Sequence, residues 1–177
     1  MGDSFPEPTS SFTGQFTAIF DANFPRLFRY LDRLSGDPEL AADLAQESFM
    51  RLYLRGTLPD APAAWLISVA MNLFRNEYGR RSRRRRLLTE DRSRQALGDA
   101  PLAPDEQVVA GETRRRVRAT IEQLPERARQ LLLLQAEGYS YREMAAGLGL
   151  HEASVGTLLA RARQEFRELF GDRADAS

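Results

Sequence analysis

Apolar residues recur every three or four positions along most of this chain, and no stretch has the strict alternation of a half-buried strand. The pattern predicts an all-α protein. Pro25 is expected to kink or divide the first helix, and Asp37-Pro38 is a strong start signal for the second. The helices expected before the C-terminal part span residues 15–35, 38–54, 62–81 and 105–123, with a loop at 56–62.

The segment 124–166 has the pattern of a helix-turn-helix. Pro125 is expected at the first position of a helix, where the N–H that it lacks would have no partner anyway. Gly138 is expected to end that helix with a positive φ. Ser140 and Glu143 then form a capping box, which predicts that a short second helix starts there.

A longer helix is expected to start at Glu152, after a tight turn bracketed by Gly147 and Gly149. A short helix, a glycine-containing turn and a longer helix is the arrangement that places one helix in the major groove of DNA. The sequence therefore makes DNA the leading candidate partner. The residues expected to face inward from the last helix are Val155, Leu158, Leu159, Ala162 and Phe166.

These elements predict two small helical domains joined by a flexible linker. The linker prediction depends on the loss of apolar periodicity after the third helix and on the Gly and Pro residues near position 100. The expected division is a tail at 1–12, a first domain at 13–84, a linker at 85–104, a helix-turn-helix domain at 105–170 and a tail at 171–177.

Composition excludes several kinds of site. The chain has no cysteine, and His151 is its single histidine, so neither a thiolate metal site nor a histidine cluster is available. We expect no catalytic residues, no metal and no cofactor. No apolar stretch approaches the ~20 residues that span a bilayer, and no signal peptide is evident, so a cytoplasmic protein without membrane insertion is expected.

The formal net charge of zero hides a segregation of charge along the chain. Residues 1–50 hold three arginines against eight acidic residues, whereas residues 51–90 hold nine arginines against three. An acidic front and a basic middle predict two surfaces for two kinds of partner. Every basic side chain is arginine, since the chain has no lysine.

The third predicted helix runs into the arginine tract RRSRRRR at 80–86. Asparagine and arginine side chains along it can bond to base edges and phosphates, and aromatic residues near arginines can stack on unpaired bases. For Trp65 alone, packing in the core is the commoner role. For the arginine tract we favour nucleic acid, because the same chain carries a helix-turn-helix.

Two other helices carry polar faces. On physical grounds alone, residues 41–53 form an ordinary amphipathic helix, and nothing in its spacing requires a metal or catalysis. In the last helix, the N-terminal positions that face outward are those that contact bases in such folds, and its arginines can neutralise phosphates. The residues in question are Glu152, Ala153, Gly156, Thr157, Ala160, Arg161, Arg163 and Arg167.

Taken in order, these stretches resemble an alternative sigma factor of the extracytoplasmic-function type, within the sigma-70 family. Residues 27–54 resemble the segment that docks on the clamp coiled coil of bacterial RNA polymerase. Residues 64–81 resemble the Trp-Leu…Ala-x-Asn…Arg segment that reads and melts the −10 element, and residues 124–163 resemble the domain that binds the −35 element. The resemblance covers nearly the whole chain after the first residues.

The resemblance implies a protein without catalysis of its own that binds the polymerase core (its β and β′ subunits) and promoter DNA. It also implies an anti-sigma factor as a partner of the free protein. The residues it assigns to polymerase binding are Asp43, Gln46, Glu47, Phe49 and Arg51. Those assigned to the −10 element are Trp65, Asn72, Arg75, Asn76, Arg80 and Arg81, and those assigned to the −35 element are Tyr141, Arg142, Glu152, Ala153, Gly156, Thr157, Arg161 and Arg163.

The chain departs from the family at several positions. Many members have an arginine where Met71 stands, an acid where Asn76 stands, and Lys-Ser-Arg where residues 156–158 stand. Two alternatives to a sigma factor stay open. One is a regulator that binds duplex DNA without polymerase, and the other is a sigma-like decoy that only titrates an anti-sigma factor.

Overall fold

The computed structural model describes residues 10–91 and 108–172, with side chains for 11–80 and 111–171. Within these ranges the chain forms seven α-helices and no strand, as the sequence predicts. The helices are α1 (Ser10–Ser35), α2 (Pro38–Leu54), α3 (Pro62–Asp91), α4 (Val108–Gln123), α5 (Glu126–Ala136), α6 (Tyr141–Leu148) and α7 (Glu152–Asp172). We call α1–α3 the N-terminal unit and α4–α7 the C-terminal unit.

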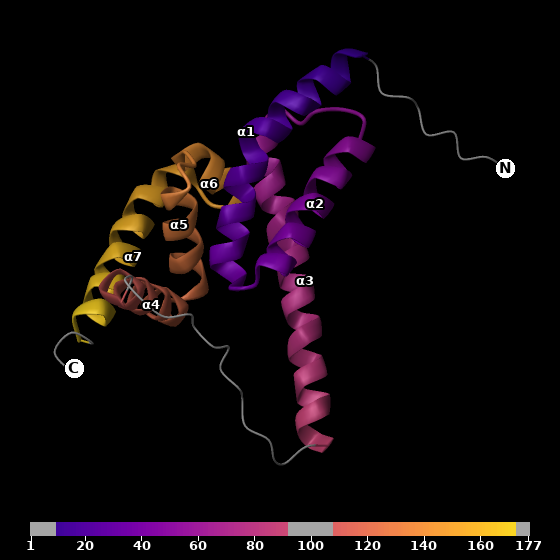
Figure 1. The fold of residues 1–177 in the computed structure, drawn as a ribbon. Helices are drawn as coiled ribbons and strands as arrows, with labels where there is room; N and C mark the ends of the chain where they lie inside the picture. Colours follow the sequence, from indigo (N-terminus) through magenta and orange to yellow (C-terminus); the bar gives the residue numbers. More distant parts are fainter. Residues whose placement is uncertain (1–9, 92–107, 173–177) are drawn as a thin grey trace.

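In the N-terminal unit, α1 and α2 form an antiparallel pair that packs on the first half of α3, while the second half of α3 projects away from the bundle (Figure 1). Asp37 caps α2 by accepting a hydrogen bond from the Leu40 backbone N–H at 3.0 Å. Pro25 lies inside a continuous α1. A ladder of aromatic rings along α1 packs on Phe49 and Tyr53 of α2; its members are Phe12, Phe16, Phe20 and Phe24.

In the C-terminal unit, the helix-turn-helix consists of α6 and α7. The capping box at its start is present, with Ser140 and Glu143 bonded to each other's backbone N–H. Gly138 has a φ of 77° and Gly149 a φ of 66°, a left-handed conformation that glycine adopts without a steric penalty. Both values confirm that these glycines end helices.

Four local predictions are wrong. Residues 10–12 belong to α1 rather than to a tail, because Phe12 is buried against Phe16 and Tyr53. Pro125 precedes α5 as its N-cap, with an extended ψ of 143°. Gly147 lies inside α6, not in the turn. At the C-terminal end, α7 includes residues 171 and 172, which were assigned to a tail.

The third helix also ends later than expected. Apolar spacing predicts an end near residue 81, yet α3 continues to Asp91. Arginine and leucine have high helix propensity, and residues 82–91 contain neither Gly nor Pro. The expected linker therefore begins after residue 91 at the earliest, and its remainder (92–104), like residues 1–9, 105–107 and 173–177, lies outside the described residues.

The buried apolar side chains of the two units form one continuous cluster. It includes Leu27 and Tyr30 of α1, Ile67 of α3, Leu134 of α5 and Leu159 of α7. The C-terminal unit lies against the side of α1 and the start of α3 (Figure 1). The two expected domains are thus packed together in this structure.

Candidate nucleic-acid interface

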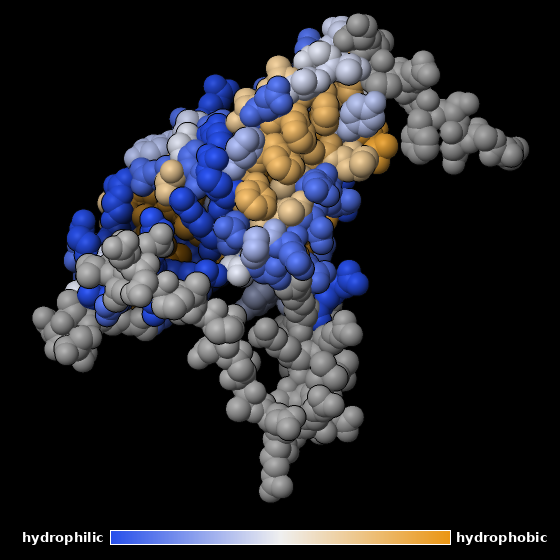
Figure 2. Space-filling model, viewed as in Figure 1, coloured by the Kyte–Doolittle hydropathy of each residue, from blue (hydrophilic) through white to orange (hydrophobic). Residues whose placement is uncertain are grey.

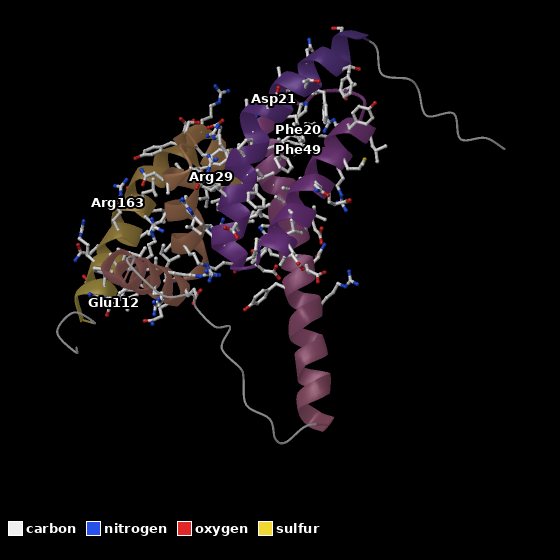
Figure 3. All side chains as sticks on the ribbon, viewed as in Figure 1. Phe20, Asp21, Arg29, Phe49, Glu112 and Arg163 are labelled. Carbon is white, nitrogen blue, oxygen red and sulfur yellow. The ribbon has the colours of Figure 1, made fainter. Side chains whose placement is uncertain are left out.

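The second helix presents a polar face beside α3. Asp43, Gln46, Glu47 and Arg51 are all exposed on α2, and Arg51 pairs with Glu47 at 2.8 Å. Phe49, assigned to the same partner by sequence, is only 3% exposed. Its ring lies 5.0 Å from that of Phe20, centroid to centroid, between α1 and α2 (Figure 3). In this structure Phe49 therefore packs α2 on α1, and the exposed face of α2 consists of the four polar residues.

A shallow groove between α2 and α3 brings two sets of predicted residues together. Asp43, Glu47 and Arg51 line it from α2, and Asn76 and Arg80 line it from α3. The helices α2 and α3 pack directly on each other, so the groove is held by the core beneath it. The groove thus joins part of the set assigned to polymerase to part of the set assigned to the −10 element.

The exposed side of α3 carries most of the predicted −10 residues. Asn72, Arg75, Asn76 and Arg80 are exposed, and the Arg75 guanidinium donates a hydrogen bond to Asn72 Oδ1 at 3.2 Å. Trp65 is half-buried against the core; Arg55 lies 5.8 Å from its ring centre, within range of a cation–π contact. The side chain of Arg81 lies outside the described residues. These donors and acceptors follow one helix for about 12 Å, at 1.5 Å per residue.

Met71 does not belong to this surface. Its side chain is fully buried, and Tyr30 donates a hydrogen bond from its hydroxyl to the Met71 Sδ at 3.2 Å. Burial raises the pKa of the Tyr30 hydroxyl far above its usual range, because ionisation would place a charge in the core. Where many family members have an arginine, this chain therefore has a methionine that packs in the core. The exposed hydrogen-bond donors of α3 are at other positions, from Asn72 to Arg80.

The helix-turn-helix presents the N-terminal part of α7 to solvent. Glu152, Ala153, Thr157 and Arg161 are exposed there, while Gly156 is half-buried. A Cβ on Gly156 would lie 3.5 Å from the Tyr141 ring, an ordinary contact distance. Because Ala153, Gly156 and Thr157 have small side chains, this part of α7 is an open surface on which a duplex can approach the backbone closely.

Three further predicted −35 residues border this surface. Tyr141 and Arg142 are exposed at the start of α6. Arg163 is also exposed and is labelled in Figure 3; it donates a hydrogen bond to Gln135 Oε1 at 2.7 Å. Tyrosine and arginine side chains are of the kinds that bond to DNA phosphates.

One polar cluster was missed by sequence reasoning. Arg26, Arg29 and Arg33 are the arginines of the acidic first 50 residues, and all three contact the end of α5. Figure 3 shows Arg29 on the side of α1 that faces the C-terminal unit. Their spacing of three and four residues places the three arginines on one face of a helix. This spacing is visible in the sequence and could have indicated the cluster.

Neither a metal centre nor a membrane span is found in the described parts of the chain. No group of three or more His, Cys, Asp or Glu residues there can hold a metal ion. Within residues 10–91 and 108–172, no helix combines the length and the apolar character needed to cross a bilayer.

Models of two sigma-70 families match this chain. The family described as "Sigma-70 region 2" matches residues 19–84, and the family described as "Sigma-70, region 4" matches residues 114–166. The first match covers most of α1, all of α2 and about the first three quarters of α3. The second runs from within α4 to within α7, so the two matches correspond to the two units.

Relatives with established names match over most of the chain. It is 31% identical to the ECF RNA polymerase sigma factor SigE of Mycolicibacterium smegmatis, over 92% of this chain and 69% of the relative. It is also 31% identical to the ECF RNA polymerase sigma factor EcfG of Rhodopseudomonas palustris, over 84% of this chain and 81% of the relative.

Two solved structures have the same fold. The sigma factor RpoE of Bartonella quintana, solved with the anti-sigma factor NepR, superposes with a TM-score of 0.65 at 20% identity, over 89% of this chain and 97% of that one. CnrH, solved with the cytosolic domain of CnrY, gives 0.63 at 23% identity, over 90% of both chains. The two family segments occur in this order on an all-helical fold, and the identity to SigE and EcfG extends over most of the chain. The chain therefore belongs to the extracytoplasmic-function (ECF) RNA polymerase sigma factors of the sigma-70 family.

Proposed function

We propose that this chain directs transcription initiation as an alternative sigma factor, binding the bacterial RNA polymerase core and promoter DNA without catalysis of its own. The observation that carries the proposal is the order of a region 2 segment and a region 4 segment on a fold with two exposed helical surfaces. Its place of action is the cytoplasm, where polymerase and promoter meet.

In this proposal the polymerase binds the exposed face of α2. The charged and polar contacts come from Asp43, Gln46, Glu47 and Arg51. The buried Phe49 holds α2 in position by packing on α1. An apolar patch over α1 and α2 continues this surface (Figure 2); its exposed members are Phe20, Met50, Tyr53 and Leu54. Exposed apolar area of this kind is typical of a protein-binding site.

The DNA contacts divide between the two units. The polar face of α3 captures unpaired bases of the −10 element, with Asn72 and Arg75 as base or phosphate donors. Unstacking a base costs a few kcal/mol, which aromatic stacking offsets at about 1–3 kcal/mol per base. Trp65, half-buried, has one side available for this role. The start of α7 enters the major groove of the −35 duplex.

Small residues at the start of α7 determine how the −35 element is read. Ala153, Gly156 and Thr157 offer few long donors to base edges. Sequence selection then depends on DNA shape and on phosphate contacts made by arginines around them, such as Arg142 and Arg161.

An anti-sigma factor completes the proposed set of partners. Of the two solved structures with this fold, one holds the sigma factor RpoE with the anti-sigma factor NepR, and the other holds CnrH with the cytosolic domain of CnrY. The apolar patch on α1 and α2 is accessible in the free chain and suits a regulator that competes with polymerase.

Run-off transcription tests the function directly. Purified bacterial core polymerase would be assayed on a pooled promoter library with and without the protein. Transcripts that require the protein and share −35 and −10 motifs are expected. Polymerase binding without any transcript would favour a decoy, and absence of polymerase binding would favour a regulator that acts alone.

A further inference from the structure

The ring of Tyr141 lies against the start of α7. Tyr141 is the first residue of α6 and is 43% exposed, and its Cε2 atom would lie 3.5 Å from a Cβ placed on Gly156. The capping box of Ser140 with Glu143 fixes the start of α6, and α6 packs on α7 (Figure 1). The fold therefore holds an exposed aromatic ring beside the part of α7 that is proposed to enter the major groove.

The adjoining side of α7 carries short side chains. Ala153 and Thr157 are exposed there, with the half-buried Gly156 between them. Their spacing of three and four residues places them on one side of the helix. We call Tyr141, Ala153, Gly156 and Thr157 together the reading face. It presents an aromatic ring, methyl groups and the threonine hydroxyl.

Long hydrogen-bond donors lie around the reading face and not on it. Residues 152–160 contain no arginine, lysine, asparagine or glutamine. Arg161 is exposed one turn beyond Thr157, about 6 Å along the helix at 1.5 Å per residue. Arg142 is exposed on α6. Guanine is most often read by an arginine or lysine that bonds to both its O6 and its N7, and the centre of the reading face has no such side chain.

Short apolar groups match a different feature of the major groove. Thymine alone among the DNA bases carries a C5-methyl group there, and the side chains that contact it are alanine, the threonine methyl and aromatic rings. Gly156 lets the backbone of α7 approach the base edges closely. From Ala153 to Thr157 the reading face is about 6 Å long at 1.5 Å per residue, which corresponds to roughly two base-pair steps of 3.4 Å.

We propose that the reading face selects thymine in the −35 element through its C5-methyl group, with Tyr141 and Thr157 as the residues that determine the selection. This deepens the proposed function and rests on it, since it names the base that the start of α7 reads. Arg142 and Arg161 position the duplex through phosphates, which carry no sequence information directly. Readout of DNA shape can also favour A·T pairs, but it does not require contact with the methyl group.

Replacing thymine by uracil removes the methyl group and leaves the base-pairing edge unchanged. A promoter selected by the run-off assay is synthesised as a labelled duplex with either thymine or uracil at its −35 positions. Its affinity is measured for holoenzyme assembled from core polymerase and the full chain. The dissociation constant should rise about fourfold for each methyl group in contact. Uracil placed between the two promoter elements is the control and should leave the affinity unchanged.

Two substitutions at Thr157 separate the contribution of its methyl group from that of its hydroxyl group. Thr157→Val keeps the methyl group and removes the hydroxyl, so the preference for thymine over uracil should persist. Thr157→Ser keeps the hydroxyl and removes the methyl group, so the preference should decrease. Position 157 is exposed, and both variants should therefore keep the fold.

An added long donor provides a test by gain of specificity. Gly156→Arg places a guanidinium at the centre of the reading face, where a Cβ fits at an ordinary contact distance. In a promoter library randomised at the −35 positions, this variant should select guanine where the wild type selects thymine. The matched control is Gly171→Arg near the other end of α7, where a Cβ would meet nothing within 4 Å; it should keep the wild-type preference.

The outcomes separate this proposal from the proposed function. Equal affinity of the holoenzyme for the thymine and uracil promoters would overturn methyl readout and leave shape and phosphate contacts as the basis of selection. A selected −35 element without A·T pairs would overturn it as well. If the run-off assay selects no promoter at all, the proposed function fails, and methyl readout fails with it.

Discussion

Reversing two acidic charges on α2 should abolish tight binding to polymerase while leaving the fold intact. The change is Asp43→Arg together with Glu47→Arg, both at exposed positions. Glu47 makes a surface ion pair with Arg51, and the two side chains are 48% and 51% exposed. Such a pair contributes about 0.3–0.5 kcal/mol after solvent screening, and the like-charged pair that replaces it costs a similar amount. The total loss of folding free energy should stay near 1 kcal/mol.

The loss at the interface should be much larger. Charge pairs across a protein interface couple by about 1.5–7 kcal/mol in double-mutant cycles. Taking the lower end of that range for each of two reversals gives about 3 kcal/mol, or a Kd raised at least 100-fold. Binding of the labelled protein to purified core polymerase, measured by fluorescence anisotropy, gives the two Kd values directly.

A matched control separates this surface from a general effect of charge. Glu122→Arg with Glu168→Arg makes the same change in net charge and breaks an i,i+4 ion pair of the same kind, that of Glu122 with Arg118. The control should bind polymerase as the wild type does. A Kd within threefold of wild type for the α2 variant, with its melting temperature preserved, would refute the assignment of this face to polymerase.

Three further predictions concern DNA and pH. Asn72→Ala should reduce promoter opening, seen as weaker permanganate reactivity, while polymerase affinity stays unchanged; normal reactivity would exclude this side chain from strand capture. Arg161→Ala with Arg163→Ala should flatten the dependence of log K on log salt by about 1.8 if each arginine neutralises one phosphate, and an equal slope would show that neither does. Burial raises the pKa of Tyr139 to about 12, and that of Tyr30 higher still. Their contribution to stability should therefore be constant below pH 10, the value for the unfolded chain, and should fall between pH 10 and 12. Urea unfolding at pH 9 and pH 11.5 measures this, and equal midpoints would contradict it.

Local signals in the sequence predicted the elements that depend on neighbouring residues. The capping box of Ser140 with Glu143, the Asp37 cap and the positive φ at Gly138 are all confirmed, because each is closed by groups within a few positions. The end of α3 was misplaced for a related reason. Apolar spacing reports where a helix is packed, and the last turns of α3 continue past the packed part.

Site residues were placed with mixed success. The polar residues of α2 and α3 are exposed as predicted, while their roles in binding stay predictions. Phe49 was assigned to a binding surface, but it is buried by aromatic rings of α1 that lie some 25 to 33 residues away in the chain. Helical spacing alone cannot tell which side of an aromatic residue another helix will cover.

The sequence by itself determined the helical class, the order of the two segments and the caps and turns, since these follow from periodicity and from contacts between near neighbours. Only the tertiary structure decided how the two units lie together. Gly147 reads as a turn residue in the sequence, and Arg29 and Glu137 are 108 residues apart, yet all three hold the units in contact. The physical reason is that close helix packing and buried ion pairs depend on partners distant in the chain, whose positions local patterns do not record.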